Sequence, residues 1–155
     1  MEIYAHSRSY DQQLCETLAI KQSALEPLLQ QCDVVVLALP LTPQTYHIID
    51  ESRAQLLQPH AMLINIGRGE LISLEALEYL SDRIYGIGID VIEGEKEWGA
   101  KQQTIVSKEK VLYTPHMAYY TKEALERIRT IPFDNMKNFV EGKPLKFELT
   151  ARIPS

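Results

Sequence analysis

The 155-residue sequence predicts an α/β fold in which a doubly wound parallel sheet is covered by helices on both faces. Strand-like and helix-like segments alternate along the chain, which is the order that strand–helix–strand units produce. The strand-like segments are almost uniformly apolar, as expected for strands that are buried on both faces. Polar or turn-forming residues follow these segments, at the edge where such sheets bind their ligands.

Five segments have the composition of strands, and four have the spacing of helices. The predicted strands are residues 2–7, 33–40, 61–67, 84–92 and 111–115. The predicted helices are residues 25–31, 51–58, 73–82 and 121–142. Ser73 is a candidate N-cap, and Pro132 should kink or interrupt the last helix. The stretch 93–110 is charged and weakly patterned, so we expect an exposed excursion there.

Composition excludes several classes of protein. The chain has the length of one domain, and its 45% hydrophobic and 24% charged residues are ordinary for a globular protein. A net charge of −5 without a basic block argues against a nucleic-acid partner. No apolar run reaches the roughly 20 residues of a membrane helix, and no signal peptide opens the chain. Cys15 and Cys32 stand apart from any Cys/His cluster, so we expect a cytoplasmic protein with no membrane partner and no bound metal.

The most informative stretch is LINIGRGELIS, residues 63–73, in which an apolar strand ends on Gly67-Arg68-Gly69. Taken alone, this pattern fits equally well a strand-to-helix turn whose arginine is merely solvated. The ends of the other strands favour a functional site, because they too carry polar or turn-forming residues. These residues are Ser7, Arg8, Pro40, Asp90, Glu95 and His116.

Arg68, Glu95 and His116 have the chemistry of a keto-acid reductase. An arginine binds a carboxylate through two parallel hydrogen bonds, and a histidine exchanges protons near neutral pH. A glutamate bonded to the second ring nitrogen would fix the tautomer and stabilise the imidazolium. The set therefore suits hydride reduction of a carbonyl beside a carboxylate. The alternatives are an ordinary loop histidine, a solvated acidic loop, and an Asp90 that merely ends its strand.

Three segments carry a resemblance to a known family: residues 32–80, residues 84–95 with the motif DVIEGE, and residues 111–125 with the motif TPH. Together they closely resemble the D-isomer-specific 2-hydroxyacid dehydrogenases, over roughly residues 3–144. The arginine in N-x-G-R-G is part of the same pattern. Within the family, the sequence looks most like D-lactate dehydrogenases, including the vancomycin-resistance type.

The resemblance implies a Rossmann-like fold and assigns roles to the candidate residues. Arg68 would hold a small 2-keto or 2-hydroxy acid, Glu95 would tune the histidine, and His116 would be the acid/base. Asp90 would bind the nicotinamide carboxamide. Other positions would lie along the cofactor, and they are Pro40, Thr45, Ile66 and Gly67. Tyr119 would line the substrate pocket or serve only in packing.

The stretch AHSRS departs from the pattern of NAD enzymes in this family. Such enzymes end this strand with an aspartate that binds the ribose hydroxyls, whereas this chain has Ser7, Arg8 and Ser9. An arginine here can bind a 2′-phosphate, and serine removes the carboxylate that would repel it. The cofactor is therefore expected to be NADP or NAD, with a preference for NADP.

A larger departure is the absence of a G-x-G-x-x-G phosphate loop and of the strand before it. Family members are about twice as long, so the chain resembles a C-terminal half: a partial dinucleotide-binding domain over 1–142 and a tail over 143–155 that returns to a substrate domain. The strands beside the missing one would pair with each other or expose their edges. We expect a homodimer, with little turnover by this chain alone. The rival interpretations are a non-catalytic coenzyme-binding or dimerisation module and a decayed remnant.

Overall fold

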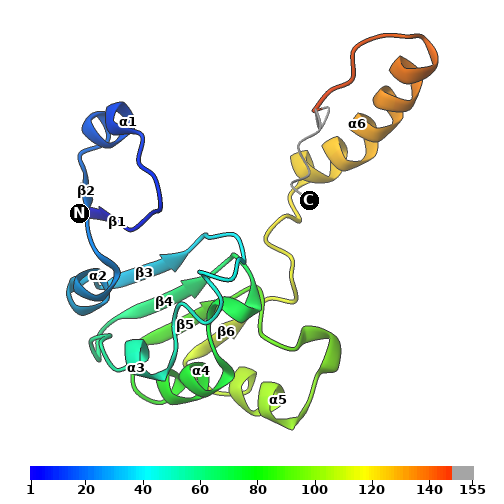
Figure 1. The fold of residues 1–155 in the computed structure, drawn as a ribbon. Coiled ribbons are helices and arrows are strands. Elements are labelled where there is room, and N and C mark those ends of the chain that lie inside the picture. Colours follow the sequence, from blue (N-terminus) through cyan, green and yellow to red (C-terminus); the bar gives the residue numbers. More distant parts are fainter. Residues whose placement is uncertain (148–155) are drawn as a thin grey trace. The chain divides into compact units, whose positions relative to one another are not determined.

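The structure is a computed structural model that describes residues 1–147 (Figure 1). The chain forms two compact units, one over Met1–His116 and a second that begins at Met117. All strand pairs in the first unit are parallel, which confirms the predicted α/β class with a Rossmann-like sheet. The predicted boundaries at 142 and 143 stay a prediction, and residues 148–155 of the predicted tail lie outside the described residues.

The main sheet contains four strands in the order β3-β4-β5-β6 (Figure 1). They are β3 (Val34–Leu37), β4 (Met62–Asn65), β5 (Gly86–Ile89) and β6 (Val111–Tyr113). Each strand lies inside a segment predicted from the sequence but is shorter than that segment. The difference falls mainly at the carboxyl ends, where the chain leaves the sheet and forms the loops that carry the candidate site.

One face of this sheet is buried and the other is largely exposed. Val35, Leu63 and Ile87 lie in register on the buried face, and they are at most 4% exposed. On the opposite face, Val36 is 52% exposed and Leu112 is 71% exposed. The sequence predicts helices on both faces, whereas the alternating burial shows that the helices of this unit cover only one.

The covering helices are α2 (Leu25–Gln31), α3 (Glu51–Ala54), α4 (Leu74–Ser81) and α5 (Ala100–Val106). Ser73 caps α4 as predicted, since its hydroxyl accepts from Ala76 N at 3.1 Å. The stretch 93–110 is largely exposed, as expected, but it contains a short 3₁₀ turn and α5, which the sequence does not predict. Helix α5 buries Gln102 and Ile105, and a seven-residue helix anchored by so few residues leaves little periodic signal.

The N-terminal segment forms a separate small sheet. Strand β1 (Ile3–Ala5) pairs in parallel with β2 (Ile20–Gln22), and α1 (Gln12–Thr17) connects them. The sequence predicts β1 but neither of the other two elements. Helix α1 is capped by Asp11, whose side chain accepts from Leu14 N at 3.0 Å. Both missed elements are short and mostly polar, so the hydrophobic pattern does not reveal them.

Strands β1 and β3 keep one unpaired edge each among the described residues. They do not pair with each other, so the second of the two predicted outcomes, exposed edges, is the one observed. A groove of about 690 Å³ lies between them, lined by residues 1–4 and by residues around Val34 and Val36. Ile3 is 42% exposed and Val34 is 45% exposed. Apolar strand edges of this kind are sites of association.

We expect the purified chain to associate through these edges. Val36→Lys places a charge on edge strand β3 and should shift the mass measured by light scattering toward the monomer. Tyr85→Lys is the matched control, since Tyr85 is 68% exposed but lies outside the groove. An average mass that Val36→Lys leaves unchanged would contradict the prediction.

The second unit contains helix α6 (Lys122–Val140), which Thr121 caps by accepting from Ala124 N at 3.1 Å. Pro132 lies inside α6 and does not interrupt it, contrary to one of the two predicted outcomes. No helix among residues 1–147 is both long enough and apolar enough to cross a membrane.

Candidate active site

Arg68 follows β4 in a turn that Asn65 closes. Asn65 is fully buried; its Nδ2 donates to Arg68 O at 2.8 Å, and its Oδ1 accepts from Gly67 N at 3.0 Å. A Cβ at Gly67 would lie 2.8 Å from Leu39 O, so only glycine fits beside this backbone. The amide and the glycine together fix the path of the chain on both sides of the arginine.

Gly69 brings the arginine segment against the segment that carries Glu95. A Cβ at Gly69 would lie 2.2 Å from Ile92 C and 2.4 Å from Glu93 N. Backbone atoms cannot give way as the end of a flexible side chain can. The two glycines around Arg68 therefore allow close backbone packing, which explains why the apolar strand is followed by glycine on both sides of the arginine.

The guanidinium of Arg68 is exposed and keeps most of its donors available. Its Nη1 donates to Gly67 O at 2.7 Å. Among residues 1–147, no carboxylate forms an ion pair with it. A guanidinium without a carboxylate partner in the protein can bind the carboxylate of a ligand through two parallel hydrogen bonds.

Glu95 and His116 form a bonded pair. Glu95 Oε2 lies 3.2 Å from His116 Nδ1, and Glu95 Oε1 accepts from Ile92 N at 3.0 Å. Because a carboxylate accepts, the proton of this bond belongs to Nδ1 of the imidazole. Nε2 of His116 forms no hydrogen bond with residues 1–147, and its role as an acid/base stays a prediction.

The backbone of His116 is held in a left-handed conformation, with φ 54°. This conformation costs on the order of 1–3 kcal/mol in a residue other than glycine and marks functional sites when the surroundings enforce it. Here His116 N donates to Asp90 O at 2.8 Å, and Asp90 N donates to Asn65 O at 3.0 Å. The Asp90 carboxylate accepts from the hydroxyl of Thr114. The ends of β4 and β5 thus fix the position of the histidine.

Tyr113 precedes this segment on β6. Burial raises the pKa of Tyr113, and the negative charges of Glu95 and Asp90 raise it further. The phenol therefore stays protonated at neutral pH.

Arg68, Glu95 and His116 line one pocket of about 500 Å³. The structure thus brings together the three residues that the sequence predicts to be catalytic, from the ends of β4, β5 and β6. The walls between them are formed by the chain at Val91 and Ile92. Glu70, Lys96 and Glu97 also line this pocket, so it carries charges of both signs, and its size suits a small ligand whose anionic group reaches Arg68.

Most of the predicted cofactor residues lie at the same sheet edge but outside this pocket. Pro40 and Thr45 belong to the turn after β3, where Thr45 Oγ1 donates to Pro40 O at 2.7 Å. Ile66 follows β4 and is 51% exposed, an unusual exposure for an apolar side chain that continues a buried strand. Gly67 comes next in the chain. Their roles stay predictions.

Ser7, Arg8 and Ser9 are exposed in a bend after β1 and do not reach the pocket. The bend is closed by Tyr10, whose hydroxyl accepts from Ser7 N at 3.0 Å and donates to Ala5 O at 3.1 Å. Arg8 forms no ion pair with a residue that the structure describes. Its charge is available for an anionic group.

Sequence reasoning missed the residues that build the site without entering it. They are His47, Asn65 and Glu93. A polar residue in the apolar run 61–67 is a signal that could have identified Asn65. The contact of Glu93 with His47 joins residues 46 positions apart, and no local pattern reports it.

Asn65→Leu should destabilise the first unit by roughly 2–4 kcal/mol, because it leaves the Gly67 amide and the Arg68 carbonyl without their partner. Urea unfolding followed by the fluorescence of Trp98, the single tryptophan, measures this free energy. Ser81→Ala is the control, since it removes one bond of a buried hydroxyl, to Glu78 O, and should cost about 1 kcal/mol. Equal losses for both variants would contradict the role of Asn65.

The chain is similar to known dehydrogenases. Residues 1–118 match the family model of the D-isomer specific 2-hydroxyacid dehydrogenase NAD binding domain. The glyoxylate reductase of Pyrococcus furiosus is 34% identical over 92% of this chain and 42% of its own length. The D-lactate dehydrogenase of Lactobacillus delbrueckii is 31% identical over 77% of this chain and 40% of its own length.

A solved structure shows the same similarity. The D-lactate dehydrogenase of Aquifex aeolicus, in complex with NAD and lactic acid, has a TM-score of 0.80 at 32% identity and covers 92% of this chain and 47% of that one. The chain thus spans less than half the length of the relatives it matches. With a family model that covers three quarters of its residues, the chain belongs to the D-isomer-specific 2-hydroxyacid dehydrogenase family, and residues 1–118 are the part that matches the family's NAD-binding domain.

Proposed function

We propose that the chain is the coenzyme-domain part of an enzyme that interconverts a small 2-keto acid and the D-2-hydroxy acid with a nicotinamide cofactor. The observation that carries the proposal is the joint placement, in one pocket, of a bonded Glu95–His116 pair and an Arg68 that forms no ion pair with residues 1–147. Family membership supports the type of reaction.

The three side chains divide the work in the direction of reduction. Arg68 binds the carboxylate and so orients the neighbouring carbonyl. His116 donates a proton from Nε2 to the carbonyl oxygen as negative charge develops there. Glu95 accepts from Nδ1, which orients the ring and stabilises its protonated form. In the reverse direction His116 accepts the hydroxyl proton.

The residues present fit one end of the cofactor. At the ends of β3 and β4, the backbone at Leu39 and Gly67 lies in direct contact, and Ile66 is exposed beside it as an apolar surface for a flat ring. When bound, the nicotinamide supplies or accepts the hydride. The 155-residue sequence contains no G-x-G-x-x-G, so the pyrophosphate needs a binding loop from outside these residues.

Pyruvate and glyoxylate are the substrates to test first. The related proteins are named for lactate and for glyoxylate, and pyruvate and glyoxylate are both small enough for a pocket of about 500 Å³.

Homodimeric assembly and a cytoplasmic location are also proposals. Unpaired strand edges support the first, and the free thiols of Cys15 and Cys32 support the second.

A hybrid enzyme tests the function. In it, this chain replaces the matched part of the Aquifex aeolicus D-lactate dehydrogenase, and oxidation of NADH and NADPH is followed with pyruvate and glyoxylate. We expect turnover by the hybrid and negligible turnover by the 155-residue chain by itself. A folded hybrid that binds cofactor but reduces neither acid would contradict the proposal, and the intact relative controls for the assay.

The same hybrid tests the proposed preference for NADP. Arg8 is exposed and forms no ion pair with a residue in the described part of the chain, so it can bind the dianionic 2′-phosphate. Arg8→Ala should raise the Kd of NADPH about tenfold, corresponding to roughly 1.5 kcal/mol for one charge-assisted bond, and leave the Kd of NADH within about twofold. Fluorescence titration measures both. Equal changes for the two cofactors would show that Arg8 does not recognise the phosphate.

A further inference from the structure

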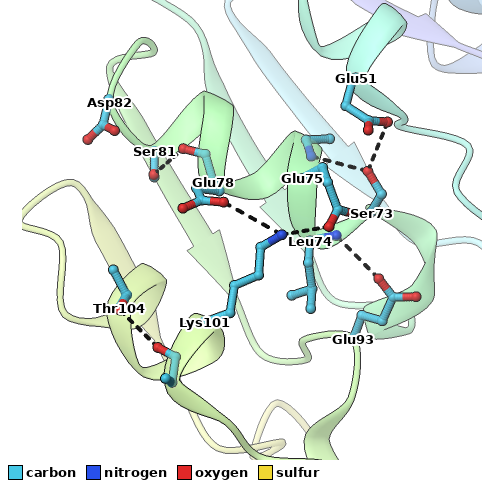
Figure 2. A network of polar contacts seen from close by, with 12 residues as sticks. Glu51, Ser73, Leu74, Glu75, Glu78, Ser81, Asp82, Glu93, Lys101 and Thr104 are labelled. Carbon is cyan, nitrogen blue, oxygen red and sulfur yellow. Dashed lines mark hydrogen bonds and ion pairs between the residues drawn. The ribbon is translucent and has the colours of Figure 1, made fainter.

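Glu93 lies two residues before the proposed Glu95 and makes contacts that the proposed reaction does not use. Its Oε1 lies 2.8 Å from His47 Nε2 and accepts from the Tyr46 hydroxyl at 3.3 Å. Its Oε2 accepts from Leu74 N at 3.2 Å, and Figure 2 shows this carboxylate directed at the start of α4. The side chain is only 20% exposed. Both oxygens are therefore engaged by the protein.

These contacts connect the loop of Glu93 to the segment that follows Arg68. His47 N donates to Glu70 O at 2.8 Å, and Ile49 N donates to Leu71 O at 3.0 Å. Leu74 begins the helix that this same segment enters. The Glu93 carboxylate thus bonds to the stretch at 46–47 and to the amide of Leu74. The first stretch is itself hydrogen-bonded to residues 70–71, which lead into Leu74.

The geometry of His47 indicates that this contact is enforced. Its backbone is left-handed, with φ 47°, which is an unfavourable conformation outside glycine. Its ring stacks on Tyr46 with the centroids 3.9 Å apart. The pKa of Tyr46 is raised, first by loss of solvation and then by the charge of Glu93, so the hydroxyl remains a donor.

The position of Glu93 limits where Glu95 can lie. The peptide between Ile92 and Glu93 is in contact with Gly69, and Ile92 N donates to Glu95 Oε1 at 3.0 Å. The other oxygen of Glu95 lies 3.2 Å from His116 Nδ1. A shift of this peptide would move Glu95 with it and lengthen the bond to the histidine.

We propose that Glu93 is a positioning residue that bonds the loop of Glu95 to the segment of Arg68 through His47, Tyr46 and the amide of Leu74, and so keeps Glu95 bonded to His116. Glu93 does not line the pocket and does not contact the ligand. The inference rests on the proposed function for its consequence in catalysis. The effect of Glu93 on the bond between Glu95 and His116 can be tested without measuring turnover.

The test is the tautomer of His116 in the neutral ring, read from the ring nitrogen shifts in long-range ¹H–¹⁵N NMR spectra of the whole chain. The bond to Glu95 selects the Nδ1–H form, whereas an imidazole in water favours Nε2–H. We expect the Nδ1–H form to dominate in the native chain and to become the minor form in Glu93→Gln. The amide of glutamine can accept at one oxygen only, so it cannot replace both contacts.

Three further variants make the result decisive. Glu95→Gln defines the spectrum of a His116 without its partner, and Glu109→Gln, at an exposed position outside the pocket, should leave the native tautomer unchanged. His47→Gly removes the donor but suits the left-handed backbone, so it tests the contact even if Glu93→Gln fails to fold. We expect His47→Gly to shift the tautomer toward that of Glu95→Gln.

A folded Glu93→Gln or His47→Gly chain with the native His116 tautomer would overturn the proposal. This outcome is separable from failure of the proposed function. An inactive hybrid whose His116 still responds to Glu93→Gln would reject the reaction and keep the positioning role. An active hybrid whose His116 tautomer does not respond to Glu93→Gln would keep the proposed reaction and reject the positioning role of Glu93.

Discussion

Gly69→Ala is expected to destabilise the first unit by roughly 3 kcal/mol, the upper end of the range for a side chain forced into a filled space. The added methyl would lie 2.2–2.4 Å from three backbone atoms of Ile92 and Glu93. Backbone on both sides must move to make room. Since the same peptide precedes Glu95, the substitution should also disturb the bond between Glu95 and His116.

Urea unfolding monitored by Trp98 fluorescence gives the free energy, and Gly88→Ala is the matched control. A Cβ at Gly88 would have its nearest neighbour, Ile64 Cγ1, at 3.8 Å, which is an ordinary contact. Gly88→Ala should therefore change the stability by less than about 1 kcal/mol, with stabilisation favoured because the unfolded chain loses freedom. Similar free energies for the two variants would show that Gly69 is not closely packed.

Arg68→Ala should lower kcat/KM of the hybrid enzyme for a 2-keto acid by about 10²–10⁴-fold. The guanidinium has no carboxylate partner among residues 1–147, so its loss leaves the carboxylate of the substrate without its counter-charge. An ionic anchor of this kind contributes roughly 3–5 kcal/mol, which sets the size of the effect. Steady-state kinetics with pyruvate measures it.

Binding of the cofactor separates this effect from general damage. Arg68→Ala should leave the Kd of NADH within about threefold of the native value. The arginine lines the pocket proposed for the 2-keto acid, whereas the proposed nicotinamide surface is at Ile66. Arg68→Lys keeps the charge but not the planar fork of the guanidinium. Its kcat/KM for the 2-keto acid should therefore lie between those of the native hybrid and of Arg68→Ala. Loss of cofactor binding in Arg68→Ala would assign the arginine a different role.

Much of the site could be predicted because it depends on a local rule. Residues that follow the strands of a parallel sheet meet at one edge, so Arg68, Glu95 and His116 were expected near each other from their positions alone. The strands themselves were visible as apolar runs. Their carboxyl ends were predicted too long, since residues such as Ile66 continue the apolar pattern after the hydrogen-bonded ladder has ended.

The remainder depends on contacts between distant segments. Glu93 and His47 are 46 positions apart, and either residue alone looks like part of a solvated loop. The importance of Gly69 becomes apparent only where the peptide after Ile92 approaches it. Helix α5 was missed for a related reason, because its burial depends on what packs around Ile105 rather than on a repeated pattern.

The central claim is that Arg68 recognises the carboxylate of the substrate while His116 acts on the carbonyl. The most direct measurement compares pyruvate with acetaldehyde, which lacks the carboxylate, in the native hybrid and in Arg68→Ala. The account predicts a loss of about 10²–10⁴-fold in kcat/KM with pyruvate and a change of less than about threefold with acetaldehyde. Equal losses with both substrates would contradict the claim, since Arg68 would then support the fold or the cofactor rather than the acid group.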